Sequence, residues 1–375
     1  MRRTCDRLGR RYDQRVFYYH GERLAHTPPA EPSSSRYTRS FSSSTSATHA
    51  FDRDIKRQQR ANAARAHGRW QAQADDDVVT YDYFREEIAA RLVDRLDDIR
   101  REEGFPLALD VGAGAGYIHR AICQDDAFQE GGGGIGGVLK LVQLDSCQEM
   151  LHRDEHLVFE GGNRTDSYRM VSDEEGVLPF PDGTFDLVTS SASMHWVNNL
   201  PGLFSEVSRV LKPDGCFMFA MIGGTSLPEL RASMVMAEME RDGGVSPHVG
   251  PFVQLSDVGA LMQRAGFALP TIDVDTINVA FPNAAVLMEH LQRMGESNAC
   301  IKRRPRVPLD VLLATSCIYD ELFALDDGDV EASVQLIYAI GWTPHESQQK
   351  PLERGTATHK VGDMVENHEP DSLTK

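Results

Sequence analysis

The chain has 375 residues and a formal net charge of −17, with 41% hydrophobic, 8% aromatic and 25% charged residues. This composition is that of a globular protein with enough apolar side chains for a full core, which excludes collagen-like and extended disordered chains. The acidic balance argues against attraction of the whole protein to phosphate backbones, so we expect no nucleic-acid partner.

The first 50 residues differ from the rest in charge. They contain nine arginines, no lysine and four acids, and they end in a Ser/Thr-rich run. Segments rich in arginine and serine and poor in acids are typical of mitochondrial or plastid transit peptides. We therefore expect residues 1–50 to be a disordered transit peptide, with the mature chain beginning between Phe41 and Phe51. The alternative is a disordered arm without a targeting role.

Residues 51–104 predict a helical N-terminal extension. The basic, alanine-rich segment 51–70 predicts a solvated helix or, alternatively, a lid or partner contact. In segment 81–101 apolar residues recur at helical spacing, which predicts an amphipathic helix that packs on the following domain. These residues are Ile88, Leu92, Leu96 and Ile99.

From residue 105 to residue 344, short apolar runs follow one another, separated by helix-like segments and loops. The runs are 107–111, 139–144, 168–171, 185–190, 216–221, 271–281 and 331–342. Buried runs that alternate with amphipathic helices are typical of βαβ units, and so of a parallel sheet covered on both faces. We predict a doubly wound α/β domain with a mostly parallel, seven-stranded sheet over 105–344, and a polar tail over 345–375. The glycine-rich run 130–138 predicts a flexible loop.

Cysteines and histidines give little sign of a metal site. The six cysteines are scattered without a C-x-x-C pair, which fits a reducing compartment. His152 and His156 have the i, i+4 spacing that places two imidazoles on one helix face, but the sequence offers no third ligand. We therefore expect an exposed helix end there and no metal. No apolar run approaches the roughly 18 residues of a membrane-spanning helix.

Acidic residues follow three successive predicted strands. The motif LDVGAGAGYI (109–118) places Asp110 at a strand end and three glycines, Gly112, Gly114 and Gly116, before a helix. Glycines there allow a tight turn close to a ligand, and the spacing differs from the G-x-G-x-x-G of dinucleotide sites. Asp145 ends the next strand, where a carboxylate can accept both hydroxyls of a ribose, and Asp173 follows the third. We expect the three carboxylates to converge around a nucleoside-sized hollow.

The order of these motifs resembles the class I S-adenosylmethionine-dependent methyltransferases, in particular the type 11 group. The resemblance lies in LDVGAGAG (109–116), VQLD (142–145), SDEEGVLPFPDGTFDLVTSS (172–191) and EVSRVLKPDGCFMFAM (206–221). It implies that S-adenosylmethionine is the cofactor. Its amino-acid end would lie at Asp110 and the three glycines, its ribose at Asp145, and its adenine at Asp173 with Glu174. Ser190 is counted with these binding residues.

Further segments resemble the mitochondrial complex I assembly factor 5 group. They are SSASMHWVNNLPG (190–202), 222–252, MGESNA (294–299) and 340–358. This resemblance implies a mitochondrial matrix protein, at most peripheral to the inner membrane. It also implies hydroxylation of an arginine on the quinone-site iron–sulfur subunit of NADH:ubiquinone oxidoreductase (complex I) as the activity.

His195 and Trp196 follow the fourth predicted strand and are the catalytic candidates. An imidazole there can act as a general base, and an indole can cover a cation, although both residues could equally pack under the cofactor loop. A second set of acids that would suit an arginine substrate is Glu238, Glu240 and Asp242, although a solvated helix face is the better account of them.

Hydroxylation needs an oxidant, such as a flavin or iron held by two histidines and a carboxylate, and the sequence shows neither pattern. That activity is therefore implied by the resemblance alone. Two alternatives stay open. One is an O-methyltransferase acting on a small molecule or a carrier-bound acid, similar to the malonyl-acyl-carrier methyltransferases, and the other is a non-catalytic assembly chaperone.

Overall fold

The computed structural model describes residues 49–71, 81–99, 101, 103–123, 134–156 and 165–349. Nearly all of the predicted transit peptide (1–50) and most of the polar tail (345–375) lie outside these ranges. The described residues form a sheet of seven strands in the order β3-β2-β1-β4-β5-β7-β6. The strands are β1 (Leu107–Val111), β2 (Lys140–Asp145), β3 (Asp166–Val171), β4 (Phe185–Ser191), β5 (Leu211–Ile222), β6 (Ala268–Phe281) and β7 (Val330–Trp342). Only β7 runs in the opposite direction to the other six strands, which confirms the mostly parallel sheet.

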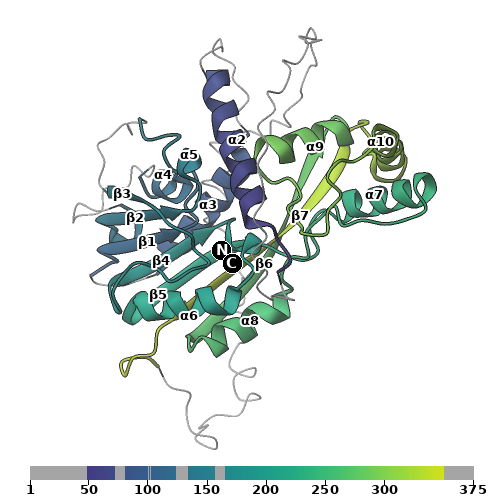
Figure 1. The fold of residues 1–375 in the computed structure, drawn as a ribbon. Helices are drawn as coiled ribbons and strands as arrows, with labels where there is room; N and C mark the ends of the chain where they lie inside the picture. The colour runs from purple at the N-terminus through teal and green to yellow at the C-terminus, as the bar shows by residue number, and fades with distance from the viewer. Residues whose placement is uncertain are drawn as a thin grey trace, which may run out of the picture.

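Helices cover both faces of the sheet (Figure 1). They are α2 (Arg53–Gln71), α3 (Tyr83–Asp97), α4 (Tyr117–Cys123), α5 (Gln148–Leu151), α6 (Leu200–Val210), α7 (Pro228–Arg241), α8 (Leu255–Arg264), α9 (Ala284–Arg293) and α10 (Leu309–Phe323), with 3₁₀ turns η1 (Ile135–Gly137) and η2 (Met194–Trp196). Helices α3 and α4 share one apolar core with β4 and β5, and α6 and α8 share a second on the opposite face. This is the doubly wound arrangement expected from alternating strands and helices.

The burial of each strand explains its sequence. Every residue of β4 is buried, and the run from Gly215 to Ile222 in β5 is buried as well, because helices cover both faces of these central strands. Strand β3 lies at the edge of the sheet, and its apolar residues Tyr168, Met170 and Val171 stay exposed. Apolar content alone therefore does not separate the central strands from the edge strand.

Helix α3 is part of the main domain's packing. Its residues Ile88, Leu92 and Leu96 are fully buried in the same core as Phe105 and Leu187. Helix α2, by contrast, stands across the edge of the sheet where the parallel strands end (Figure 1). The two predicted helices of the extension thus have different roles, although the boundary near residue 105 stays a prediction.

The structure bears on two local expectations, the flexible glycine-rich loop and the exposed helix end at His152 and His156. The glycine-rich run was expected to be wholly flexible, but its last residues form η1, where Gly136 has a φ of 70° and accepts a hydrogen bond from the backbone N–H of Phe105. A side chain at Gly136 would collide with Leu96, so glycine permits α3 to pack there. His152 directly follows the last residue of α5 and is exposed, as expected for an exposed helix end, and His156 lies beyond the helix, so the two imidazoles do not share a helical face.

Insertions around the last two strands build a third apolar cluster. Helices α7, α9 and α10 pack together beside β6 and β7 (Figure 1). Helices α9 and α10 were not predicted. None of the helices in the described ranges is long and apolar enough to cross a membrane.

Candidate cofactor and substrate site

The turn between β1 and α4 depends on glycine. Gly112, Gly114 and Gly116 all have positive φ, at 71°, 58° and 83°. A Cβ atom at Gly112 would lie 2.1 Å from the hydroxyl of Ser193, so this position excludes larger residues for steric as well as conformational reasons. The turn brings the backbone N–H of Gly114 within 2.9 Å of a carboxylate oxygen of Asp145.

Asp145 and Asp110 lie near the carboxyl ends of the neighbouring strands β2 and β1. Asp145 is fully buried and also accepts a hydrogen bond of 2.7 Å from the backbone N–H of Cys147. Asp110 is buried with one carboxylate oxygen 3.3 Å from the Thr189 hydroxyl and the other without a partner among the described residues. Burial raises the pKa of Asp110 to about 7; the Thr189 hydroxyl opposes the rise and the Asp145 carboxylate adds to it. Asp110 thus offers an unpaired polar group at the strand end.

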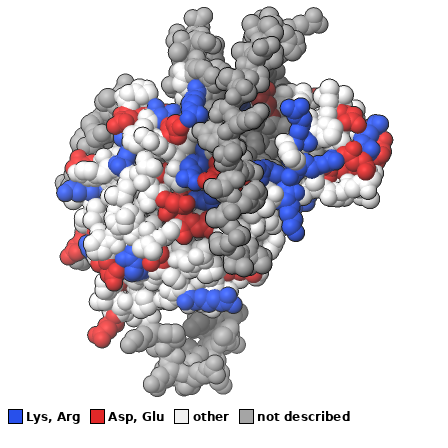
Figure 2. Space-filling model, in the orientation of Figure 1, with Lys and Arg blue, Asp and Glu red and all other residues white. Residues whose placement is uncertain are grey.

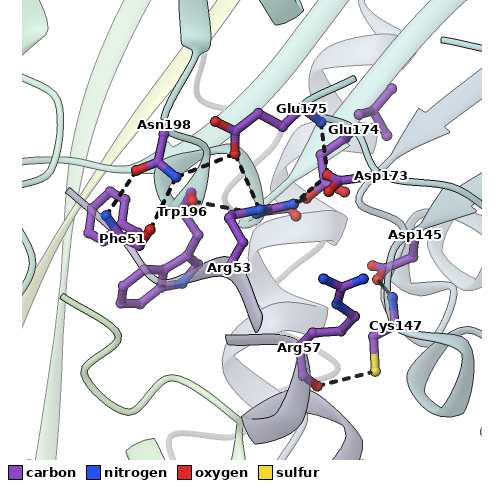
Figure 3. Close-up of polar contacts among 12 residues, drawn as sticks. Phe51, Arg53, Arg57, Asp145, Cys147, Asp173, Glu174, Glu175, Trp196 and Asn198 are labelled. Carbon is purple, nitrogen blue, oxygen red and sulfur yellow. Dashed lines mark hydrogen bonds and ion pairs between the residues drawn. The ribbon is translucent and has the colours of Figure 1, made fainter. Parts of the chain in front are cut away.

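The acids that follow β3 face helix α2 (Figure 3). The Arg53 guanidinium donates to Asp173 at 3.0 Å and to Glu174 at 2.5 Å, and lies 3.4 Å from Glu175. Burial would raise the pKa of Asp173, but the backbone N–H of Glu175 and the Arg53 guanidinium hold it below its usual value. A groove of about 1520 Å³ runs between α2 and this loop, with Asp173 in its lining.

Two further basic residues of α2 reach into the interior. Arg60 is buried, lies 3.4 Å from Asp145 and donates to the Ser193 hydroxyl at 3.2 Å. Lys56, one turn earlier, is buried against the loop after α9. The segment expected to be a solvated helix therefore buries its basic face over the site, in line with the alternative of a lid. The hollow expected to be bounded by all three acids is not seen among the described residues. Asp173 lines the groove, whereas Asp110 and Asp145 do not, and the Arg60 side chain lies against Asp145.

His195 and Trp196 come from η2, directly after β4, and both are buried. The indole N–H of Trp196 donates to a carboxylate oxygen of Glu296 at 2.6 Å. His195 Nε2 lies 3.6 Å from the same oxygen, too far for a hydrogen bond, and neither ring nitrogen has a hydrogen-bond partner among the described residues. The two predicted catalytic residues thus meet at one carboxylate that sequence reasoning had not singled out.

Charges around Glu296 set the protonation states. Arg85 of α3 pairs with the other oxygen of Glu296. Although burial would raise the pKa of Glu296, Lys56 and Arg85 hold it well below its usual value. Burial lowers the pKa of His195 to about 4 despite the nearby carboxylate, and the cations Arg60 and Lys56 lower it further. At neutral pH His195 is therefore an uncharged imidazole, able to accept a proton but surrounded by cations that oppose it.

The remaining candidates lie elsewhere or are already engaged. The Ser190 hydroxyl donates to the carbonyl of Val111 at 2.7 Å and so ties β4 to β1. Glu238 of α7 bonds Ser246 and pairs with His248 and Arg304, so the structure does not bring it to His195. Asp242 also pairs with Arg304, and Glu240 is exposed. No group of three or more potential metal ligands occurs among the residues that the structure describes.

Sequence reasoning missed four residues of the site: Arg53, Lys56, Arg60 and Glu296. The first three recur at spacings of three and four residues, which places them on one helix face, and this signal was present in the basic segment. Glu296 lay within the motif MGESNA but had no visible role, because its partners are up to 240 residues away in the chain.

The residues present fit S-adenosylmethionine. Asp110 and Glu174 each keep one buried carboxylate oxygen without a partner in the described part of the chain. Such acceptors suit the amino, hydroxyl and exocyclic amine donors of that molecule. Glycine at positions 112, 114 and 116 keeps Cβ atoms out of the turn between β1 and α4, where Ser193 and Tyr117 lie close.

Strand order, glycine turn and strand-end acids together define a class I methyltransferase-type domain. Comparison with known proteins agrees, because residues 109–219 match the family described as "Methyltransferase domain".

Comparison over the whole chain specifies the family. The chain is 42% identical over 328 residues to "Arginine-hydroxylase NDUFAF5, mitochondrial" of Rattus norvegicus, covering 87% of each protein. It is 42% identical over 314 residues to the Homo sapiens protein of the same name, covering 84% of this chain and 83% of that one. It is 30% identical to "Malonyl-[acyl-carrier protein] O-methyltransferase" of Laribacter hongkongensis, over 80% of this chain and 95% of that one. This chain belongs to the mitochondrial NDUFAF5 family, and it is an enzyme with a methyltransferase fold.

Proposed function

We propose that this protein binds S-adenosylmethionine and hydroxylates an arginine of the quinone-site iron–sulfur subunit of complex I during assembly, in the mitochondrial matrix and at most peripheral to the inner membrane. The observation that carries the proposal is the 42% identity to arginine-hydroxylases over most of the chain, together with strand-end acids suited to the cofactor. The arginine-rich residues 1–50 support mitochondrial import.

In this proposal the described residues bind and position. Asp145 would hold the cofactor's ribose, Asp173 and Glu174 its adenine, and Asp110 with the glycine turn its amino-acid end. S-adenosylmethionine supplies an electrophilic methyl group on a cationic sulfur when bound. His195, uncharged at neutral pH, is placed to accept a proton, and Trp196 to cover a cation.

Mass spectrometry of the iron–sulfur subunit tests the reaction. The subunit is isolated from cells that lack the gene and from cells that carry it. Loss of the mass of one oxygen atom from an arginine supports hydroxylation. Loss of the mass of one methylene group instead shows methyl transfer, and an unchanged subunit contradicts a modifying role on this partner.

Cofactor binding is tested separately by calorimetry of S-adenosylmethionine with the purified protein. We expect one site per chain, and absence of heat together with absence of thermal stabilisation would remove the cofactor from the proposal.

A second candidate is methyl transfer to a carrier-bound acid, which the Laribacter relative supports at 30% identity. A methyl-transfer assay with malonyl-acyl-carrier protein distinguishes it, because the arginine-directed enzyme is expected to leave that substrate unchanged.

A further inference from the structure

Lys56 occupies a compact site for a cation. Its ammonium nitrogen lies 3.4 Å from the centre of the Trp196 ring and donates to the backbone carbonyls of Gly295 and Ser297 at 3.1 and 2.8 Å. A carboxylate oxygen of Glu296 lies 3.8 Å away. We call these four groups the cation cage: the Trp196 ring, the Glu296 carboxylate and the two carbonyls. An aromatic face, an anion and two acceptors at one point select for positive charge.

The acceptors of the cage favour a hydrogen-bond donor at the position of the Lys56 ammonium. The side chain of Glu296 is only 9% exposed and is already paired on its other oxygen with Arg85. If Lys56 left without replacement, two buried carbonyls and one side of the carboxylate would lose their partner, which is costly in a buried site. Entry of another cation would keep the charge constant, whereas a neutral ligand would not.

An apolar cavity adjoins the cage. It has a volume of about 60 Å³, and its lining includes Trp196 and Glu296 together with Tyr83, Phe252 and Met294. A ligand that fits both features carries a positive head on an apolar stem. A planar guanidinium suits the ring face and the carboxylate better than a compact ammonium does, because it stacks and offers several donors in one plane.

We propose that the cation cage receives the guanidinium of the substrate arginine, and that Lys56 holds its place in the substrate-free protein. The inference rests on the proposed function, since it assigns the substrate of that same site. It requires α2 to shift when substrate binds. Gly295 permits the close contact between α2 and the loop after α9, because a Cβ at this position would lie 3.2 Å from the Cα of Arg60.

Binding of a small arginine probe tests the proposal. N-acetyl-L-arginine amide is titrated into wild type and Lys56→Ala by ligand-observed NMR, with the citrulline analogue as the neutral isostere. Lys56→Ala is expected to bind the arginine probe at least about ten-fold tighter, because no internal cation competes. Arg65→Ala is the matched control on the same helix, because Arg65 is exposed and pairs with Glu149. Equal affinity of wild type and Lys56→Ala, or equal affinity for citrulline, would overturn the proposal.

A second measurement uses the wild type and so does not depend on the folding of a variant. Burial lowers the pKa of Lys56 to about 7 against the attraction of Glu296, and repulsion by Arg60 and Arg85 adds to the fall. As pH rises from about 6 to about 8 the ammonium loses its proton while the probe stays charged, so the affinity of wild type for the arginine probe should rise several-fold. The other titratable groups that face Lys56 do not titrate in this range: His195, Glu296, Arg85 and Cys300.

The carboxyl of Asp110, with its pKa of about 7, is present in both wild type and Lys56→Ala. A rise in affinity caused by Asp110 would therefore appear in both proteins, whereas a rise caused by Lys56 should be absent from the variant. An affinity independent of pH in wild type would count against Lys56 as the competing cation.

Calorimetry of S-adenosylmethionine on the same samples distinguishes failure of the cation-cage proposal from failure of the proposed function. Cofactor binding without any gain for the arginine probe in Lys56→Ala overturns the cage and leaves the proposed function standing. A gain for the probe without cofactor binding supports the cage and removes the cofactor role.

Discussion

The two ends of the sheet contribute to the site in different ways. At the parallel end, Asp110, Asp145 and Asp173 follow three successive strands. At the antiparallel end, Glu296 follows a helix inserted between β6 and β7. Acids at parallel strand ends meet because the strands point the same way. Glu296 reaches the site because α9, which precedes it, packs against α2.

Helix α2 joins the two ends. It faces the parallel end with Arg53 and Arg60 and the antiparallel end with Lys56, all from one face. On the molecular face seen in Figure 2, basic and acidic side chains are interspersed. One helix therefore contacts both the acids proposed to bind the cofactor and the carboxylate proposed to bind the substrate arginine, and changes at each end of the sheet separate the two proposed roles.

Glu296→Ala is expected to have the largest effect. It leaves Lys56 and Arg85 buried without their carboxylate, which should lower the free energy of unfolding by about 3–5 kcal/mol. Chemical denaturation measures the loss. Glu289→Ala, at an exposed pair on α9, should change it by less than about 0.5 kcal/mol. Equal effects at the two positions would mean that the buried cluster does not stabilise the antiparallel end.

Gly112→Ala tests the parallel end. The left-handed φ and the clash with Ser193 should together lower the free energy of unfolding by about 2–4 kcal/mol and abolish binding of S-adenosylmethionine. Gly183→Ala is the matched control, because Gly183 has a φ of 61° with nothing within 4 Å of an added Cβ. It should show only the conformational part, about 1–2 kcal/mol. A Gly112→Ala protein as stable as Gly183→Ala would show that the turn has room for a side chain.

Acid titration tests the protonation state of His195. Its pKa is about 4 in the folded protein against 6.5 for the ordinary group, so the unfolded chain takes up the proton first as pH falls. The stabilisation from the neutral imidazole is complete above about pH 6.5 and is lost as pH falls towards about 4, by roughly 3 kcal/mol. Denaturation curves of wild type and His195→Gln across this range measure it. Parallel curves for the two proteins would contradict a depressed pKa.

Asp145→Asn tests the cofactor role of the parallel end, and because Asp145 is buried beside Arg60 the change should also lower the free energy of unfolding. The amide cannot accept from the ribose with a charge, so affinity for S-adenosylmethionine should fall by about 1–3 kcal/mol in calorimetry. Asp166→Asn, exposed at the opposite end of β3, should bind normally. Unchanged affinity in Asp145→Asn would remove the ribose role.

Much of the parallel end was predictable from local sequence. The glycine turn and the acids at strand ends needed only the alternation of buried runs and helices, and the seven strands fell within a few residues of their predicted positions. The helical stretch expected after Asp145 is short, because α5 ends at Leu151. Helices α9 and α10 were not predicted, although Asn283 caps the N-terminus of α9 and Gly295 follows its end.

The sequence by itself determined the order of strands along the chain, the glycine turn and the acids that follow each parallel strand. These depend on short-range periodicity and on backbone conformations open only to glycine. Tertiary structure alone decided that Arg53, Lys56 and Arg60 face the site and that His195 and Trp196 meet Glu296. Such contacts join segments more than 80 residues apart. Which charges meet, and how deeply they are buried, depends on how the helices pack, and no local sequence pattern encodes this.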